Sequence, residues 1–303
     1  MMGGEANVNK RTHRFGDWAW GYGMIFPLFA GLAIFYYYPV FKVFYDSFFT
    51  VGAFDKRSFT GISNYVTMLS DGAMWKSLGN TMIYVICIVP VTVFLALVLA
   101  EMLNSGIKGR NVFRVIYFIP TVTMSVAIAM MWRWIFNGDF GILNYLLALV
   151  GVPARYWLSE ATSAIVCISV VSVWMGVGLN MIILLAGIQG IPAHYYEAAR
   201  LDGASKTRQF FSITIPLVTP TLFFVVITTM ISTLQIFDVI YMMIAPKSAA
   251  LNETQSIVVY FFRNAFEYSK KGYASAVAVF LFVIILGITA IQMKLQKKWV
   301  NYD

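Results

Sequence analysis

Charged residues are scarce in this chain of 303 residues. Only 12% of the residues are Asp, Glu, Lys or Arg, whereas 59% are hydrophobic, and the mean hydropathy is +0.73. Soluble domains carry about 25% charged residues, which they need to cover their surface. The composition disfavours a disordered chain, a disulfide-stapled domain and a nucleic-acid-binding protein. It indicates an integral membrane protein.

Cysteine and histidine are also nearly missing. Cys87 and Cys167 lie far apart in apolar runs, which gives neither a disulfide framework nor metal-ligand spacing. His13 and His194 fall in predicted loops, and no G-x-x-x-x-G-K-[ST] phosphate loop occurs. A membrane hydrolase would need a nucleophile and a base, or metal ligands, at membrane depth. We therefore expect no catalytic residue, no metal site and no bound cofactor, and this chain is not expected to be an enzyme.

Long uncharged runs are what the chain has instead. Six of them approach or exceed the roughly 20 residues that cross a bilayer as a helix. The runs are 18–41, 77–100, 115–132, 161–189, 209–237 and 272–293. They predict an all-α membrane protein with six transmembrane helices, divided into an N-terminal segment 1–17, a transmembrane domain 18–293 and a tail 294–303. Pro90 and Pro120 fall inside runs, where proline is expected to kink the helix.

The distribution of Lys and Arg predicts the orientation in the membrane. Residues 1–17, 101–114, 190–208 and 294–303 together hold 12 basic residues in 60 positions, whereas the opposite loops hold 10 in 97. Basic residues concentrate on the cytoplasmic side. Both termini are therefore expected in the cytoplasm.

None of the six runs carries a charge near its middle. Ion-coupled transporters usually keep an ionisable group at membrane depth. The interior offers uncharged polar groups, which suit a neutral, hydroxyl-rich solute or, alternatively, hydrogen bonds between helices. These groups are Asn80, Thr81, Thr92, Thr121, Thr123, Ser125, Ser172, Asn180, Thr228, Thr229, Ser232, Thr233 and Gln235.

The 190–216 segment differs from an ordinary connector. Pro192 is placed for the start of a helix, and Gly203 can end that helix in a left-handed cap. Tyr195 and Leu201 are among the residues that would give the short helix an apolar side. The pattern predicts a short, rigid helix that a partner protein could hold.

This segment resembles the EAA motif of ABC importer permeases. Glu197-Ala198-Ala199 is followed by Gly203 and, after nine residues, by Ile213-x-Ile215-Pro216, where the family has Leu in place of Ile215. Further matches extend over most of the chain and resemble the carbohydrate-uptake subgroup, of the maltose and glycerol-phosphate permease type. They lie at 59–65, 75–81, 113–114, 118–120, 265–266 and 272–276.

The resemblance implies the type I ABC importer permease fold, in a multi-pass protein of the bacterial inner membrane. Two permease subunits, usually a heterodimer, form the pathway for a sugar in the lipid bilayer. Two ATPase subunits hold ATP and Mg²⁺, and an external solute-binding protein delivers the solute. No nucleic-acid partner is implied.

The resemblance also implies residues for two sites. The coupling site, which would contact an ATPase subunit, comprises Glu197, Ala198, Ala199, Asp202, Gly203 and Pro216. The substrate pathway comprises Ser172, Gly176, Leu179, Thr229, Ser232, Thr233 and Ile236. We add Trp174 to it, because this residue lies in the same stretch and its ring can stack on a pyranose face. Several of these pathway positions are smaller or more apolar than in the maltose permease, which leaves open whether the sugar contacts this subunit or its partner.

Two other functions remain alternatives. A self-sufficient facilitator or channel would also have six spans and an uncharged interior. A glycerol-3-phosphate permease would fit the same subgroup, but a phosphate site favours convergent Arg or Lys, which the spans do not offer. A neutral saccharide is therefore the preferred cargo.

Overall fold

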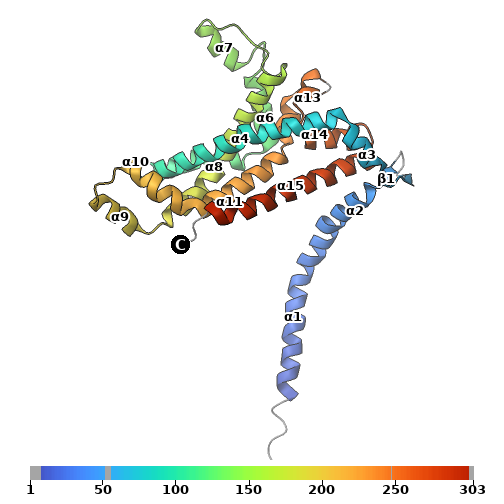
Figure 1. Cartoon of the computed structure of the whole chain (residues 1–303), viewed down its shortest axis with the longest axis horizontal. Helices are drawn as coiled ribbons and strands as arrows, with labels where there is room; N and C mark the ends of the chain where they lie inside the picture. Colours follow the sequence, from blue (N-terminus) through green and yellow to red (C-terminus); the bar gives the residue numbers. More distant parts are fainter. Residues whose placement is uncertain (1–7, 52–55, 247, 300–303) are drawn as a thin grey trace, which may run out of the picture.

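Four long helices form the body of the protein in this computed structural model, which describes residues 8–51, 56–246 and 248–299 (Figure 1). They are α4 (Gly72–Asn104), α8 (Ala161–Gln189), α11 (Ile215–Leu234) and α15 (Lys271–Trp299). Helix α8 contacts α4 and α11, and α11 also contacts α4 and α15. Helix α8 has the bounds that the uncharged run predicts, and α4 passes through Pro90 as one helix.

The first span leaves the body as a long stalk (Figure 1). It consists of α1 (Val8–Leu32), a π-helical turn η1 (Ala33–Tyr37) and α2 (Tyr38–Asp46). Only α2 returns to the body, where Phe44 contacts Phe282 of α15 with ring centroids 5.7 Å apart. None of the most apolar stretch of the span Trp20–Asp46 is buried. A helix that is apolar on all sides needs lipid or another subunit around it.

The predicted terminal segments are only partly described. Residues 1–7 and 300–303 lie outside the described residues. Helix α1 runs across the expected boundary at residues 17 and 18, and α15 runs across the one at residues 293 and 294.

The third span is broken, which corrects the expectation of one helix over 115–132. Helices α5 (Arg110–Val122) and α6 (Ser125–Ile135) meet at an angle of 97°. The bend lies at Thr123 and Met124, whose backbones are extended, and not at Pro120, which stays inside α5. Five helices are therefore long enough to cross a membrane by themselves within the described residues, and the bent pair counts as the sixth span.

Helix α7 (Ile142–Leu149) connects α6 to α8 around one buried asparagine. The Asn144 amide donates to the backbone oxygens of Gly138 (2.8 Å) and Arg155 (2.9 Å), and its oxygen accepts from Trp157 Nε1 (2.8 Å). Through Asn144, these contacts hold the beginning and the end of the 136–160 segment together.

Short elements gather at the end of the body where α4 begins (Figure 1). They are β1 (Phe49–Val51), paired antiparallel with β2 (Arg57–Phe59), and α3 (Ser63–Ser70), α12 (Asp238–Met243), α13 (Ala249–Thr254), α14 (Ile257–Phe262) and the π-helical η4 (Arg263–Glu267). Helix α4 holds two of them through predicted interior polar groups. Asn80 donates to the backbone oxygen of Glu253 (2.8 Å), and Thr81 Oγ1 accepts from Ile257 N (2.9 Å). These two side chains thus hold α13 and α14 against α4.

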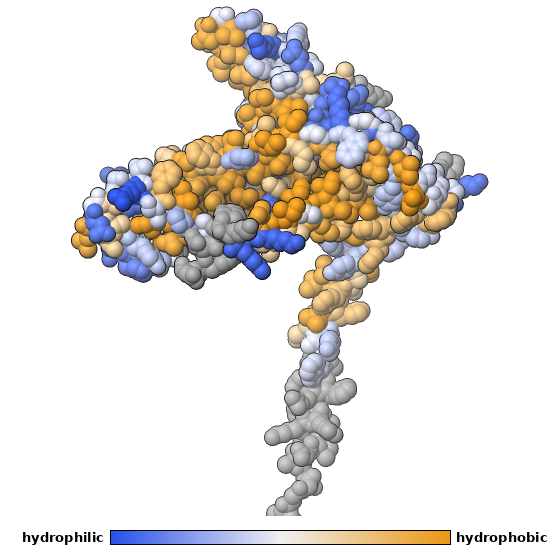
Figure 2. All heavy atoms as spheres, in the orientation of Figure 1, coloured by the Kyte–Doolittle hydropathy of each residue, from blue (hydrophilic) through white to orange (hydrophobic). Residues whose placement is uncertain are grey.

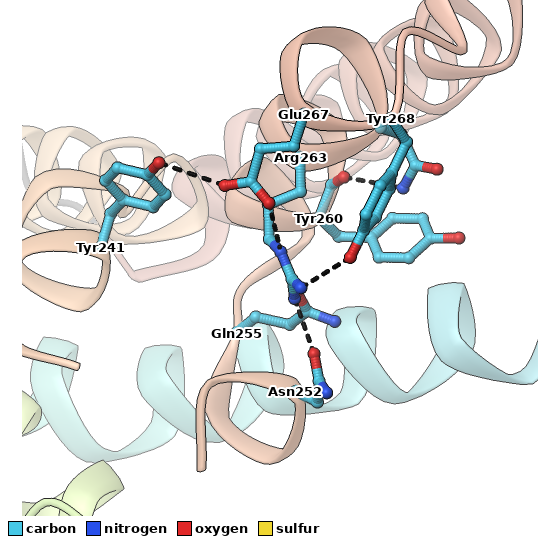
Figure 3. A network of polar contacts seen from close by, with 8 residues as sticks. Tyr241, Asn252, Gln255, Tyr260, Arg263, Glu267 and Tyr268 are labelled. Atoms are coloured by element: carbon cyan, nitrogen blue, oxygen red, sulfur yellow. Dashed lines mark hydrogen bonds and ion pairs between the residues drawn. The ribbon is translucent and has the colours of Figure 1, made fainter. Parts of the chain in front are cut away.

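Arg263 is the charged centre of this end (Figure 3). Its guanidinium donates to Asn252 Oδ1 (2.7 Å), Gln255 Oε1 (2.8 Å) and Tyr268 Oη (2.7 Å), and it pairs with Glu267 at 3.2 Å. Only 7% of its side chain is exposed. Buried charges need this degree of pairing, so the network fixes α13 against η4.

Gly178 lets α8 approach α5 closely. A Cβ at this position would overlap the backbone carbonyl of Tyr117. We expect Gly178→Ala to lower the free energy of unfolding by about 1–3 kcal/mol, because backbone cannot yield as a flexible side chain can. Gly287→Ala in α15 is the control, since nothing lies within 4 Å of its Cβ position, and it should stabilise the helix by about 0.5–1 kcal/mol. Denaturation of the purified protein in detergent measures both; a harmless Gly178→Ala would contradict this packing.

Candidate coupling loop and solute cavity

The predicted short helix is present as α9 (Ala193–Leu201). Pro192 precedes it as the N-cap, and Gly203 follows it with φ +73°. Two backbone hydrogen bonds close the cap, from Gly203 N to Arg200 O (3.1 Å) and from Ala204 N to Ala199 O (2.9 Å). The left-handed cap at Gly203 is therefore confirmed.

Helix α9 lies at the end of the body opposite α13 and α14 and projects away from the long helices (Figure 1). None of its residues is buried; Leu201 is 90% exposed and Tyr195 is 42% exposed. Figure 2 shows polar surface at this end, beyond the apolar sides of the long helices. Tyr195 and Leu201 thus present apolar surface that the described chain leaves exposed.

Two polar contacts connect α9 and the residues after it to the helical segment that continues into α11. After α10 (Lys206–Gln209), the π-helical η3 (Phe210–Thr214) leads directly into α11. The hydroxyls of Tyr196 and Thr214 are 3.0 Å apart, and Gln209 Nε2 donates to Ala204 O (2.8 Å). Burial raises the pKa of Tyr196, so its hydroxyl keeps its proton. A displacement of α9 can therefore reach α11 through hydrogen bonds.

The structure brings the predicted coupling residues together on this loop. Glu197, Ala198, Asp202 and Gly203 are exposed, and Ala199 is half-buried. Pro216 is half-buried in the first turn of α11. The roles of Tyr196, Gln209 and Thr214 were not predicted, because nothing in the order of residues shows which side chains face back toward the bundle.

A cavity of about 430 Å³ opens between α4, α8 and α11, with contributions from α5 and α12. Seven of the eight predicted pathway residues line it: Ser172, Gly176, Leu179, Thr229, Ser232, Thr233 and Ile236. Other lining residues include Thr92, Thr121, Asn180 and Thr228, and no lining residue among those described is charged. Their role in solute binding stays a prediction.

Trp174 does not line this cavity. It lines a separate apolar cavity of about 800 Å³ between α4, α5 and α8, and its ring meets that of Trp132 at 5.7 Å. The tryptophan therefore lies away from the other pathway residues in this conformation.

Most hydroxyls of the cavity already donate their proton to the protein. Ser172 donates to Ile168 O (2.8 Å), Thr228 to Phe224 O (2.9 Å) and Thr233 to Thr229 O (2.8 Å). Asn180 Nδ2 donates to Thr229 Oγ1 (3.1 Å). Such hydroxyls keep lone pairs that can accept hydrogen bonds, so the cavity offers uncharged acceptors.

Membrane-length helices around an uncharged cavity, with an exposed helix on a connecting loop, define the membrane component of a solute transport system. The chain belongs to the family described as binding-protein-dependent transport system inner membrane component, which matches residues 88–301. This confirms the family expected from the EAA motif and the location as a multi-pass protein of the inner membrane.

Relatives and solved structures agree with this assignment. The chain is 36% identical over 304 residues to the probable ABC transporter permease protein YesP of Bacillus subtilis (99% of this chain, 97% of the relative). It is 33% identical to the trehalose/maltose transport system permease protein MalF of Thermococcus litoralis, over 90% of this chain and 92% of the relative. The structure is also similar to a chain in the crystal structure of a bacterial alginate ABC transporter in complex with its alginate pentasaccharide-bound periplasmic protein. The TM-score is 0.85 at 21% identity, over 95% of this chain and 96% of that chain. This chain therefore has the ABC transporter permease fold.

Proposed function

We propose that this chain is one of two permease subunits of an ATP-driven importer and forms half of the pathway for a neutral sugar or oligosaccharide. The observation that carries the proposal is the connection between two features. Helix α9 is exposed on a loop that leads directly into α11, and α11 lines the cavity. A partner that moves α9 can thereby act on the solute site.

In this proposal α9 docks on one of two separate ATPase subunits, which hold ATP and Mg²⁺. Leu201 and Tyr195 supply the apolar contact area, and Glu197 supplies a charge. Helix α9 then lies on the cytoplasmic side, together with the segments 1–17 and 294–303. An external solute-binding protein docks at the opposite end, where the short elements around α13 and α14 gather.

A second permease subunit covers the stalk. The span Trp20–Asp46 leaves its most apolar stretch unburied, and a chain that worked alone would leave that surface to lipid only. We propose a heterodimer, in agreement with the family resemblance. Membership of a binding-protein-dependent family likewise favours the importer over the self-sufficient facilitator.

The lining of the cavity supports a neutral saccharide. Recognition of a phosphate or an acidic sugar favours Arg or Lys in the site, and no charged residue is among the described lining residues. One relative is named for trehalose and maltose, which agrees with this class. A glycerol-3-phosphate cargo would need basic groups from the second permease.

A photo-crosslinking amino acid at position 201 tests the coupling contact. In the membrane complex, the probe at Leu201 should capture an ATPase subunit. The control probe replaces Phe266, which is 66% exposed near the other end of the body, and should capture none. Equal capture at both positions, or none at 201, would overturn the proposed docking of α9.

A further inference from the structure

The Thr92 hydroxyl differs from the cavity hydroxyls that donate to backbone carbonyls, which are those of Thr121, Ser172, Thr228 and Thr233. Thr92 lies in α4, lines the cavity and is only 1% exposed. Its Oγ1 is buried and has no hydrogen-bond partner among the described residues. A buried hydroxyl without a partner is costly, and natural proteins keep few of them, so this one calls for a functional reason.

A glycine of α8 lies beside Thr92. Gly176 of α8 faces it: a Cβ at this glycine would lie 3.4 Å from Thr92 Cγ2 and 4.0 Å from Asn180 Nδ2. Asn180 in turn donates to Thr229 Oγ1 of α11 at 3.1 Å. The missing side chain of Gly176 thus leaves Thr92, Asn180 and Thr229 around one corner of the cavity, each from a different helix.

The chemistry of the whole cavity is complementary to a sugar. The hydroxyls of Ser172, Thr228 and Thr233 already donate hydrogen bonds to backbone carbonyls. Toward a solute, they can therefore only accept hydrogen bonds. The Thr92 proton has no acceptor among the described residues. A saccharide presents hydroxyl groups, which donate and accept, and ether oxygens, which only accept. An ether oxygen or a hydroxyl oxygen can take the proton of Thr92.

We propose that the Thr92 hydroxyl is a specificity-determining donor, which binds an oxygen of a neutral saccharide beside Asn180 and Thr229. This inference rests on the proposed function and deepens it. The hydroxyl is covered in this conformation, because α4 packs against α8 and α11. The contact therefore forms when these helices separate during transport, and the unpaired hydroxyl favours that solute-bound arrangement.

The same helix offers a matched control. Thr81 is also fully buried, but its Oγ1 donates to Ser77 O (2.8 Å) and accepts from Ile257 N (2.9 Å). A structural hydroxyl and a solute-binding hydroxyl thus lie on one helix. Replacement of each by the isosteric valine separates their roles.

The test uses the complete importer in proteoliposomes, with ATP inside, and maltose, trehalose and lactose as probes. For the disaccharide that the wild-type assembly takes up best, Thr92→Val should raise the KM about three- to tenfold, as expected for one lost hydrogen bond. The thermal midpoint of Thr92→Val should stay equal or rise, because the unpaired hydroxyl is gone. Thr81→Val should keep the KM within twofold but lower the midpoint by about 3 °C or more. Thr92→Ser, which keeps the hydroxyl, should keep the KM within twofold.

The outcomes separate this inference from the proposed function. An unchanged KM in Thr92→Val, or a loss of stability like that of Thr81→Val, would overturn the role of Thr92 while leaving the importer intact. If the wild-type assembly takes up none of the three disaccharides, the proposed neutral-sugar function fails first.

Discussion

Replacement of Gly203 by valine is expected to reduce ATP-driven uptake at least tenfold. Gly203 ends α9 with φ +73°, a conformation that costs a residue with a Cβ roughly 1–2 kcal/mol, and a β-branched residue more. A cost of 1.4 kcal/mol alone lowers the ratio of capped to uncapped loop tenfold. Without the cap, α9 cannot present a fixed surface to the ATPase. Uptake of labelled sugar by cells that express equal amounts of the complex measures the effect.

The control for this prediction is Gly203→Asn. Asparagine enters the left-handed region more easily than other residues with a Cβ, and nothing lies within 4 Å of the Cβ position of Gly203 in this chain. The asparagine variant should therefore keep most of the uptake. Normal uptake in Gly203→Val would show that the shape of the loop does not matter for coupling.

Loss of the Arg263 guanidinium should have the largest effect on stability. In Arg263→Met, Glu267 loses its ion-pair partner and the oxygens of Asn252 and Gln255 lose their donor (Figure 3). Removal of one partner of a buried pair typically costs about 3–5 kcal/mol. We expect a corresponding fall in the free energy of unfolding and a lower yield of folded protein, measured by denaturation in detergent.

An exposed ion pair at the same end provides the comparison. Lys76 and Glu253 form a salt bridge, but about half of each side chain is exposed. Exposed pairs contribute only about 0–1 kcal/mol, so Lys76→Met should change stability little. Equal losses in Arg263→Met and Lys76→Met would contradict the importance of burial in this network.

The sequence was sufficient where the determinants of structure are local. The bounds of α8 follow from an uncharged run between Glu160 and a loop, and α9 follows from Pro192 and Gly203. In both segments, a few neighbouring residues decide where the helix begins and ends. The family assignment likewise depended on spacing within one loop.

The bend in the third span could not be predicted in the same way. Thr123 and Met124 have extended backbones that any residue adopts, so no glycine or proline marks the break. Pro120, the apparent signal, is accommodated within α5. After the bend, α6 packs against α12. Contacts of this kind between distant segments leave no pattern in the sequence.

The lining of the cavity could be predicted from the sequence only in part. The seven residues that the family resemblance implies all line the cavity, whereas Trp174, which was predicted from its place in the same stretch of sequence, lines a different cavity. The residues that distinguish the cavity chemically depend on where α4 lies against α8. Thr92 differs from Thr81 only through its partners, and those partners come from other helices.

ATP-dependent uptake in proteoliposomes tests the central claim most directly. Vesicles are prepared with this chain alone, and with this chain together with its second permease, the ATPase subunits and the external solute-binding protein. We expect uptake of a neutral saccharide only in the complete set with ATP inside. Flux of the saccharide through vesicles that contain this chain alone, without ATP, would show that the chain is a facilitator and not a subunit of an ATP-driven importer.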